Sequence, residues 1–92
     1  MLFLCVFTFD ASRRKAFIKR RAQQGENIPD GVRVLMEVAD LTKNRVFRLA
    51  EAADLKGIEE ANGAWSDLCR IETIPVERSQ EIVQKLVRMK GQ

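Results

Sequence analysis

The sequence predicts an α+β fold of the ferredoxin-like type, a β-α-β-β-α-β sandwich with an extra C-terminal helix. Three observations predict it. An uncharged apolar segment opens the chain, a polar turn, IPDG, separates a basic helical segment from two β-branched segments, and a second helical segment precedes one last strand. A chain of 92 residues builds one hydrophobic core, so we expect a single domain over residues 1–92.

Residues 1–9, MLFLCVFTF, predict a central strand, because alternate side chains are apolar on both faces. The run is too short to cross a bilayer, and it lacks the basic start and the small-residue cleavage site of a signal peptide. Its Cys5 is far in sequence from the other cysteine, Cys69, so no disulfide framework is indicated. We therefore expect a cytoplasmic protein with no membrane association.

The next segments predict a helix and a hairpin. Residues 11–24 form a basic helical segment, with Asp10 or Ser12 as its cap and Gly25 as its end. After the IPDG turn come two segments rich in β-branched residues, VRVLMEVAD and RVFRLAEA. Because only LTKN separates them, they predict a β-hairpin.

The second half of the chain predicts helix, strand and helix. Residues 54–68 form a helical segment with Asp54 as its N-cap. Its buried stripe is predicted from residues at helical spacing, namely Leu55, Ile58, Asn62 and Trp65. Residues 69–78 predict a strand at a sheet edge, because Pro75 cannot donate to a ladder. An amphipathic segment at about 79–90 predicts the C-terminal helix.

In this fold the two central helices cover one sheet face, and the first strand makes the other face apolar as well. Exposed rows of Phe or Leu are not stable in water. The C-terminal helix can cover part of this second face, and the sheet of another copy can cover all of it. We expect a homodimer through the sheet.

Three segments, IPDGVRVL, RVFRLAEA and ANGAWSDL-x₅-IPV, together with the leading apolar strand, resemble the family catalogued as domain of unknown function 3303. The resemblance covers nearly the whole chain up to the last helix. It implies a small dimeric α+β barrel with sheet-to-sheet association, and it implies no activity. The chain lacks His in its first two strands, which excludes histidine-based chemistry.

Composition excludes several kinds of site. The chain contains no His and no Tyr, so imidazole metal ligation, Ser-His-Asp catalysis and phenol chemistry are excluded. There is no CxxC pair, and we expect no metal and no cofactor. The net charge of +3 is compatible with binding to nucleic acid. However, the third strand, NRVFRLAEA, lacks the Gly and aromatic pattern of RNA-recognition modules. Nucleic acid is therefore not the expected partner.

Three residues interrupt the pattern of their helices, and they are the predicted ligand-binding residues. Arg21 lies on the arc of the first helix that should face the sheet, where it either reaches the rim or enters a pocket and binds an anionic group. Asn62 interrupts an apolar stripe, where it either ties down backbone or lines a pocket with Trp65. No catalytic residue is indicated.

These residues favour a small-molecule binding or sensing module that acts as a homodimer and takes a small anionic or aromatic molecule. One alternative is a cofactor-independent monooxygenase or isomerase of the dimeric α+β barrel type, by fold analogy. Another is a polyanion or nucleic-acid binder that uses the basic first helix. Whether the protein is an enzyme stays open at this point.

Overall fold

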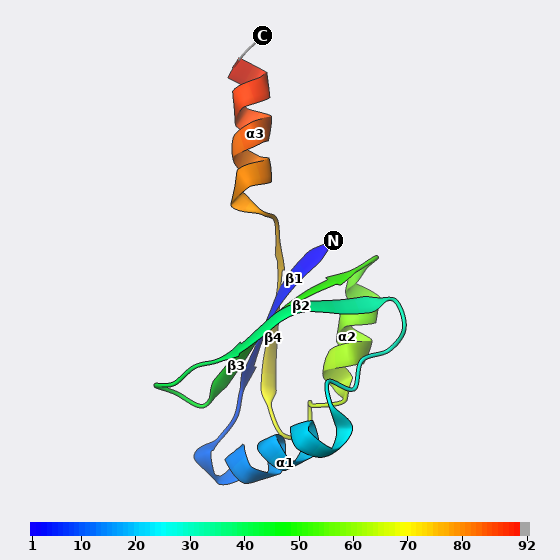
Figure 1. Ribbon diagram of the computed structural model, residues 1–92, viewed down its shortest axis with the longest axis vertical. Helices are drawn as coiled ribbons and strands as arrows, with labels where there is room; N and C mark the ends of the chain where they lie inside the picture. The colour runs from blue at the N-terminus through cyan, green and yellow to red at the C-terminus, as the bar shows by residue number, and fades with distance from the viewer. Residues whose placement is uncertain (91–92) are drawn as a thin grey trace.

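The computed structural model describes residues 1–90 as a four-stranded antiparallel sheet with helices (Figure 1). The elements are β1 (Leu2–Thr8), a 3₁₀ turn η1 (Ala11–Arg13), α1 (Arg14–Gln24), β2 (Val32–Ala39), β3 (Arg45–Ala52), α2 (Leu55–Gly63), β4 (Arg70–Val76) and α3 (Ser79–Lys90). The predicted ferredoxin-like α+β order, with its extra C-terminal helix, is confirmed.

The strand order in the sheet is β2-β3-β1-β4, with antiparallel pairing throughout. β1 is central, as its two apolar faces predict. β4 is an edge strand, where the missing N–H of Pro75 does not have to serve a second neighbour. In the centre of the sheet, Cys5 lies between Arg48 of β3 and Thr73 of β4.

The core lies on the face of the sheet that carries Phe3, Cys5 and Phe7, and we call it the helix-covered face. These side chains are at most 1% exposed. Phe17 from α1 and Ile58 from α2 belong to the same buried cluster. Burying aromatic and branched side chains in this way stabilises a domain by about 1.5–3 kcal/mol each.

α1 begins differently from the prediction. Neither Asp10 nor Ser12 caps it through a side-chain hydrogen bond; instead the Arg13 N–H donates to the carbonyl oxygen of Asp10 at 2.9 Å, and a 3₁₀ turn leads into the helix. The end of α1 is as predicted, because Gly25 follows it with φ of 63°, a left-handed conformation that favours glycine.

α2 is shorter than predicted. Its N-cap is confirmed, because the Asp54 carboxylate accepts a hydrogen bond from the Gly57 N–H at 3.1 Å. The helix ends at Gly63, and Trp65 follows in a turn. The Trp65 N–H donates a hydrogen bond to the Asn62 carbonyl. Leu55 is 46% exposed and does not belong to the buried stripe.

The other face of the sheet, which we call the open face, has no helix over it in the part of the chain described. Register places Leu4, Val6, Phe47, Leu49 and Ile74 at its centre. α3 extends away from the sheet beyond the end of β4 and covers none of this face (Figure 1). Among the described residues, no helix is long and apolar enough to span a membrane.

Candidate ligand-binding site

An apolar cavity lies between α1 and the β2–β3 hairpin. Its volume is about 350 Å³. The lining residues come from the end of β1, from α1 and from the hairpin: Phe9, Arg14, Phe17, Ile18, Glu37, Val38, Ala39, Asp40, Leu41, Lys43, Arg45 and Val46. Small-molecule sites are typically concave and mostly apolar with a few polar groups, and this cavity has that composition.

One wall of the cavity is aromatic. The rings of Phe9 and Phe17 stack with centroids 4.8 Å apart and planes 11° from parallel. Behind them, Trp65 packs against Phe17 at 5.0 Å. Offset stacking of this kind holds the rings in place, so the wall is a fixed apolar surface against which a flat ligand can lie.

Glu37 is one of the two carboxylates that line the cavity, and two guanidinium groups hold it. Its Oε1 accepts from Arg21 Nε at 3.1 Å, and its Oε2 accepts from Arg48 Nε at 3.0 Å. The Arg48 side chain is only 4% exposed and lies 4.9 Å from the centroid of the Phe7 ring. Its Nη1 is buried and has no partner among the described residues. Two cations thus surround one anion, and the cluster carries a net positive charge.

A β-bulge in β2 puts Glu37 in this position. The register with β3 shifts by one residue between Val34 and Met36. Strict alternation from Val34 would place Met36 on the helix-covered face and Glu37 on the open face. The bulge reverses this and brings Glu37 opposite Arg48 on the helix-covered face.

The rim of the cavity adds more positive charge. Asp40 accepts hydrogen bonds from Thr42 and from Arg45, and these bonds hold the pKa of its carboxyl well below its usual range. This pair is therefore neutral as a unit. Within residues 1–90, no ion pair is formed by Arg14 or by Lys43, so both charges are available to an anionic ligand.

The three residues predicted to bind a ligand lie in different places. Arg21 reaches the edge of the cavity through its ion pair with Glu37. Asn62 lies under the centre of the sheet, where its Nδ2 donates to Thr73 Oγ1 at 3.1 Å and lies 3.5 Å from Cys5 Sγ. It lines a separate shallow hollow. Trp65 is fully buried behind the aromatic wall, so the structure does not gather the three at one surface.

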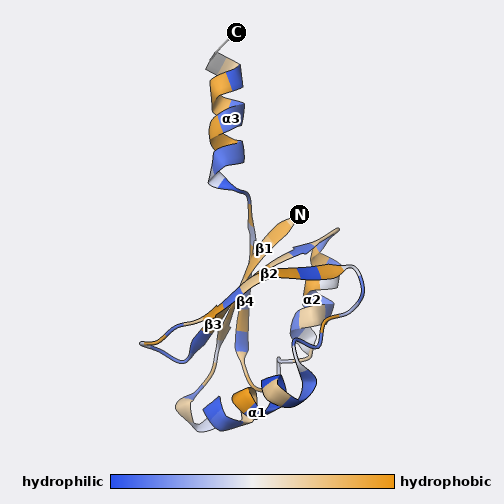
Figure 2. Cartoon of the chain, viewed as in Figure 1, coloured by the Kyte–Doolittle hydropathy of each residue, from blue (hydrophilic) through white to orange (hydrophobic). Residues whose placement is uncertain are grey.

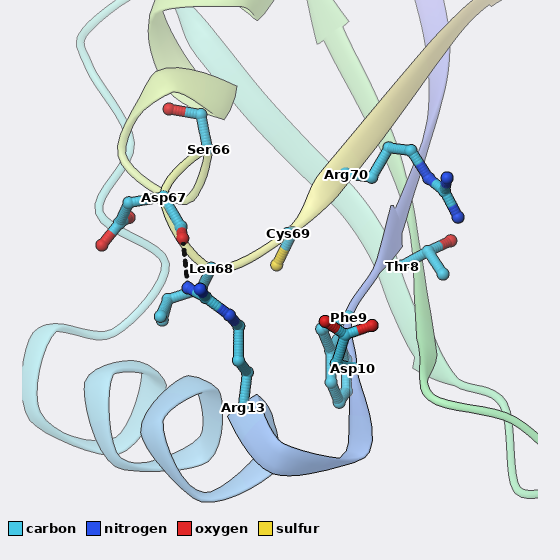
Figure 3. Close-up of a pocket in the computed structure, with 9 residues that line it drawn as sticks. All are labelled: Thr8, Phe9, Asp10, Arg13, Ser66, Asp67, Leu68, Cys69 and Arg70. Atoms are coloured by element: carbon cyan, nitrogen blue, oxygen red, sulfur yellow. Dashed lines mark hydrogen bonds between the residues drawn. The ribbon is translucent and has the colours of Figure 1, made fainter.

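A second hollow lies where η1 meets the start of β4, and Figure 3 shows the residues around it. Arg13 Nη1 donates to the carbonyl oxygen of Asp67 at 2.7 Å across its base. Burial and, to a lesser degree, the Asp67 charge raise the pKa of the Cys69 thiol to about 11. The thiol is therefore protonated at neutral pH, and the structure does not activate it as a nucleophile.

Two of the five cationic side chains of α1, those of Arg20 and Arg21, form ion pairs within the chain. Arg20 binds both carboxylate oxygens of Asp67, at 2.6 and 2.8 Å, and donates to the Ala64 carbonyl. This pairing holds the pKa of Asp67 near 2. It also anchors α1 to the turn after α2. The described residues include no cluster of three or more His, Cys, Asp or Glu side chains that could hold a metal ion.

Comparison with known proteins places the chain in a family. The family model described as "Domain of unknown function (DUF3303)" matches residues 1–90. A crystal structure of a candidate antibiotic biosynthesis monooxygenase from Deinococcus radiodurans superposes with a TM-score of 0.50 at 12% identity, covering 84% of this chain and 92% of that chain. This likeness shows the fold alone. No curated protein matches the chain.

Proposed function

The chain belongs to that family of domains of unknown function, and we propose that it is a small-molecule binding or sensing module that acts as a homodimer. Its ligand is a small anionic molecule with an aromatic or other flat apolar body. The ligand occupies the cavity between α1 and the β2–β3 hairpin. The free cysteines Cys5 and Cys69 support a reducing, cytoplasmic setting for this role.

The observation that carries the proposal is the pairing of a stacked aromatic wall with cations that no carboxylate neutralises. Phe9 and Phe17 offer a flat apolar surface. Arg14 and Lys43 approach the same cavity from its two sides. A guanidinium can bind a carboxylate through two parallel hydrogen bonds, which adds orientation as well as affinity.

The predicted ligand-binding residues enter the proposal in different roles. Arg21 is a positioning residue, because it holds Glu37 from the helix side. Trp65 supports Phe17 from behind. Asn62 lines a separate hollow, and its role in binding stays a prediction. Glu37 keeps one oxygen on each arginine and so fixes the floor of the cavity.

The homodimer is supported by the open face. Leu4, Val6, Phe47, Leu49 and Ile74 form a contiguous apolar area on it by register. A large exposed apolar patch marks an interaction surface. A second copy, with the same face, covers it with matching side chains.

Binding can be tested with 2-naphthoate as the probe and 2-naphthamide as its neutral counterpart, followed by NMR of the ¹⁵N-labelled protein. We expect 2-naphthoate to shift the amides of Phe9, Phe17 and Val38, and to bind at least fivefold more tightly than the amide. Arg14→Gln should remove this preference. Lys15→Gln removes the same charge from the neighbouring position of α1 and should leave the preference intact.

Equal chemical-shift changes with the two probes, or changes confined to other parts of the chain, would overturn the proposal.

The alternative of a cofactor-independent monooxygenase or isomerase rests on the fold. It is tested by measuring oxygen uptake with phenolic substrates. The alternative of a polyanion binder is weakened by the engagement of Arg13, Arg20 and Arg21 within the chain. Its test is an affinity that falls steeply with salt.

A further inference from the structure

α3 is amphipathic, and its apolar side is exposed. At about 100° per residue, five large apolar side chains fall on one side of the helix, and Glu81, Gln84, Lys85 and Arg88 fall on the other. The apolar side, which we call the α3 stripe, consists of Ile82, Val83, Leu86, Val87 and Met89. Each is at least 52% exposed. Figure 2 shows hydrophobic and hydrophilic residues following one another along α3, which stands clear of the sheet.

A helix of this kind needs a packing partner. Isolated helices shorter than about 12–15 residues are marginal in water, and α3 has 12 residues. Its amphipathic pattern is typical of a helix that buries one side. The contact that stabilises α3 is therefore expected to come from outside the helix itself.

The chain's own open face is not covered by α3, which extends away from the sheet (Figure 1). Only Glu77 and Arg78 separate the end of β4 from the start of α3. Lys85 Nζ reaches back to Glu77 Oε1 at 2.5 Å, which favours a helix that continues outward from the strand. The longest dimension of the chain, 55 Å, reflects this extension.

A second copy of the chain fits both uncovered surfaces. The open face measures about 19 Å across four strands and about 23 Å along them, a flat area of roughly 440 Å². A stable interface buries about 800 Å² on each partner. The α3 stripe is about 18 Å long and, at a width near 10 Å, adds roughly 180 Å² from each copy. The sheet alone thus gives a small interface, and α3 brings it closer to the usual size.

We infer that α3 is a dimerisation arm whose apolar stripe packs against a second copy of this chain, as part of the same interface as the open face. The inference rests on the homodimer of the proposed function. In a two-fold dimer each copy gives one arm and receives one, so both stripes are covered at once. The ligand cavity lies between α1 and the β2–β3 hairpin, at the end of the molecule away from α3 (Figure 1), and none of its lining residues belongs to the α3 stripe.

The test is sedimentation velocity of the full chain over a dilution series. We expect a dimer, with a dissociation constant raised at least tenfold by Leu86→Lys or Ile82→Lys. Gln84→Lys introduces the same charge on the polar side of α3 and should change it less than twofold. These side chains lie outside the core, so the variants are expected to fold, and circular dichroism checks this.

Each outcome is decisive. Equal dissociation constants for Leu86→Lys and Gln84→Lys would overturn the inference that α3 is a dimerisation arm. If Phe47→Lys then still raised the dissociation constant, the dimer would form through the open face of the sheet without α3. A wild-type monomer at all concentrations would overturn both. Titration of the Leu86→Lys variant with 2-naphthoate separates this inference from the ligand proposal, because the cavity should be unaffected.

Discussion

The Glu37 cluster gives the sharpest prediction about stability. Glu37→Gln keeps the shape of the side chain but leaves Arg48, which is 4% exposed, without a counter-ion. Breaking a buried pair in this way costs about 3–5 kcal/mol. Since Glu37 itself is 18% exposed, we expect the lower end, a loss of about 3 kcal/mol in the free energy of unfolding.

Removing the other partner should cost much less. Arg48→Met removes the buried charge and keeps most of the volume, and Glu37 retains its bond to Arg21. We expect a loss of about 1 kcal/mol or less, since replacing a buried ion by an apolar side chain is often neutral. The double variant should be close to Arg48→Met alone, which gives a coupling energy of about 3 kcal/mol in magnitude between the two positions.

Urea unfolding followed by the fluorescence of Trp65, at one protein concentration, measures these differences. With an m-value of about 1 kcal/mol/M, Glu37→Gln should lower the midpoint by about 3 M. Glu51→Gln is the control, because its pair with Arg33 is long, at 3.8 Å, and exposed; it should change stability by less than about 1 kcal/mol. Equal losses of unfolding free energy for Glu37→Gln and Arg48→Met, with no coupling between them, would contradict the claim that the buried Arg48 cation depends on the Glu37 carboxylate.

Three further predictions concern single contacts. Asp54→Ala should lower the free energy of unfolding by about 1 kcal/mol in urea, because it removes the cap on Gly57; no change would exclude the cap. Asp67 has its pKa lowered from 3.8 to about 2 by Arg20, so its contribution is full above about pH 4 and lost as pH falls towards 2. The melting temperatures of the wild type and Asp67→Asn should therefore differ at pH 6 and converge at pH 2, and a constant gap would contradict this. Cys69, with a pKa near 11, should react with iodoacetamide at pH 8 about a hundredfold more slowly than an exposed thiol, as mass spectrometry would show; rapid labelling would contradict its burial.

The fold could be predicted because its signals are local and agree with one another. β1 is apolar on both faces and lies at the centre of the sheet, and Pro75 lies on an edge strand. The end of α2 was missed for a tertiary reason. Helical spacing from Ile58 extends to Trp65 in the sequence, but the core contacts of Trp65 with Phe17 hold it in a turn after Gly63.

The candidate site was less accessible to sequence reasoning. The position of Arg21 on the sheet-facing arc of α1 was correct, and its anionic partner turned out to be Glu37 of the same chain. The face of the sheet on which Glu37 lies depends on a one-residue bulge after Val34. No pattern in the segment VRVLMEVAD indicates this bulge. Phe9 lies beyond the end of its strand, so only the folded chain shows its stacking on Phe17.

Native mass spectrometry of the protein, purified at low salt from cells, tests the binding of a small anionic molecule most directly. It reports the number of chains and any retained small molecule together. We predict a species of two chains that carries a bound organic anion, and an Arg14→Gln variant that loses the anion but keeps both chains. Two chains without any added mass, in the wild type and the variant alike, would contradict the claim that the cavity between α1 and the hairpin is a ligand site.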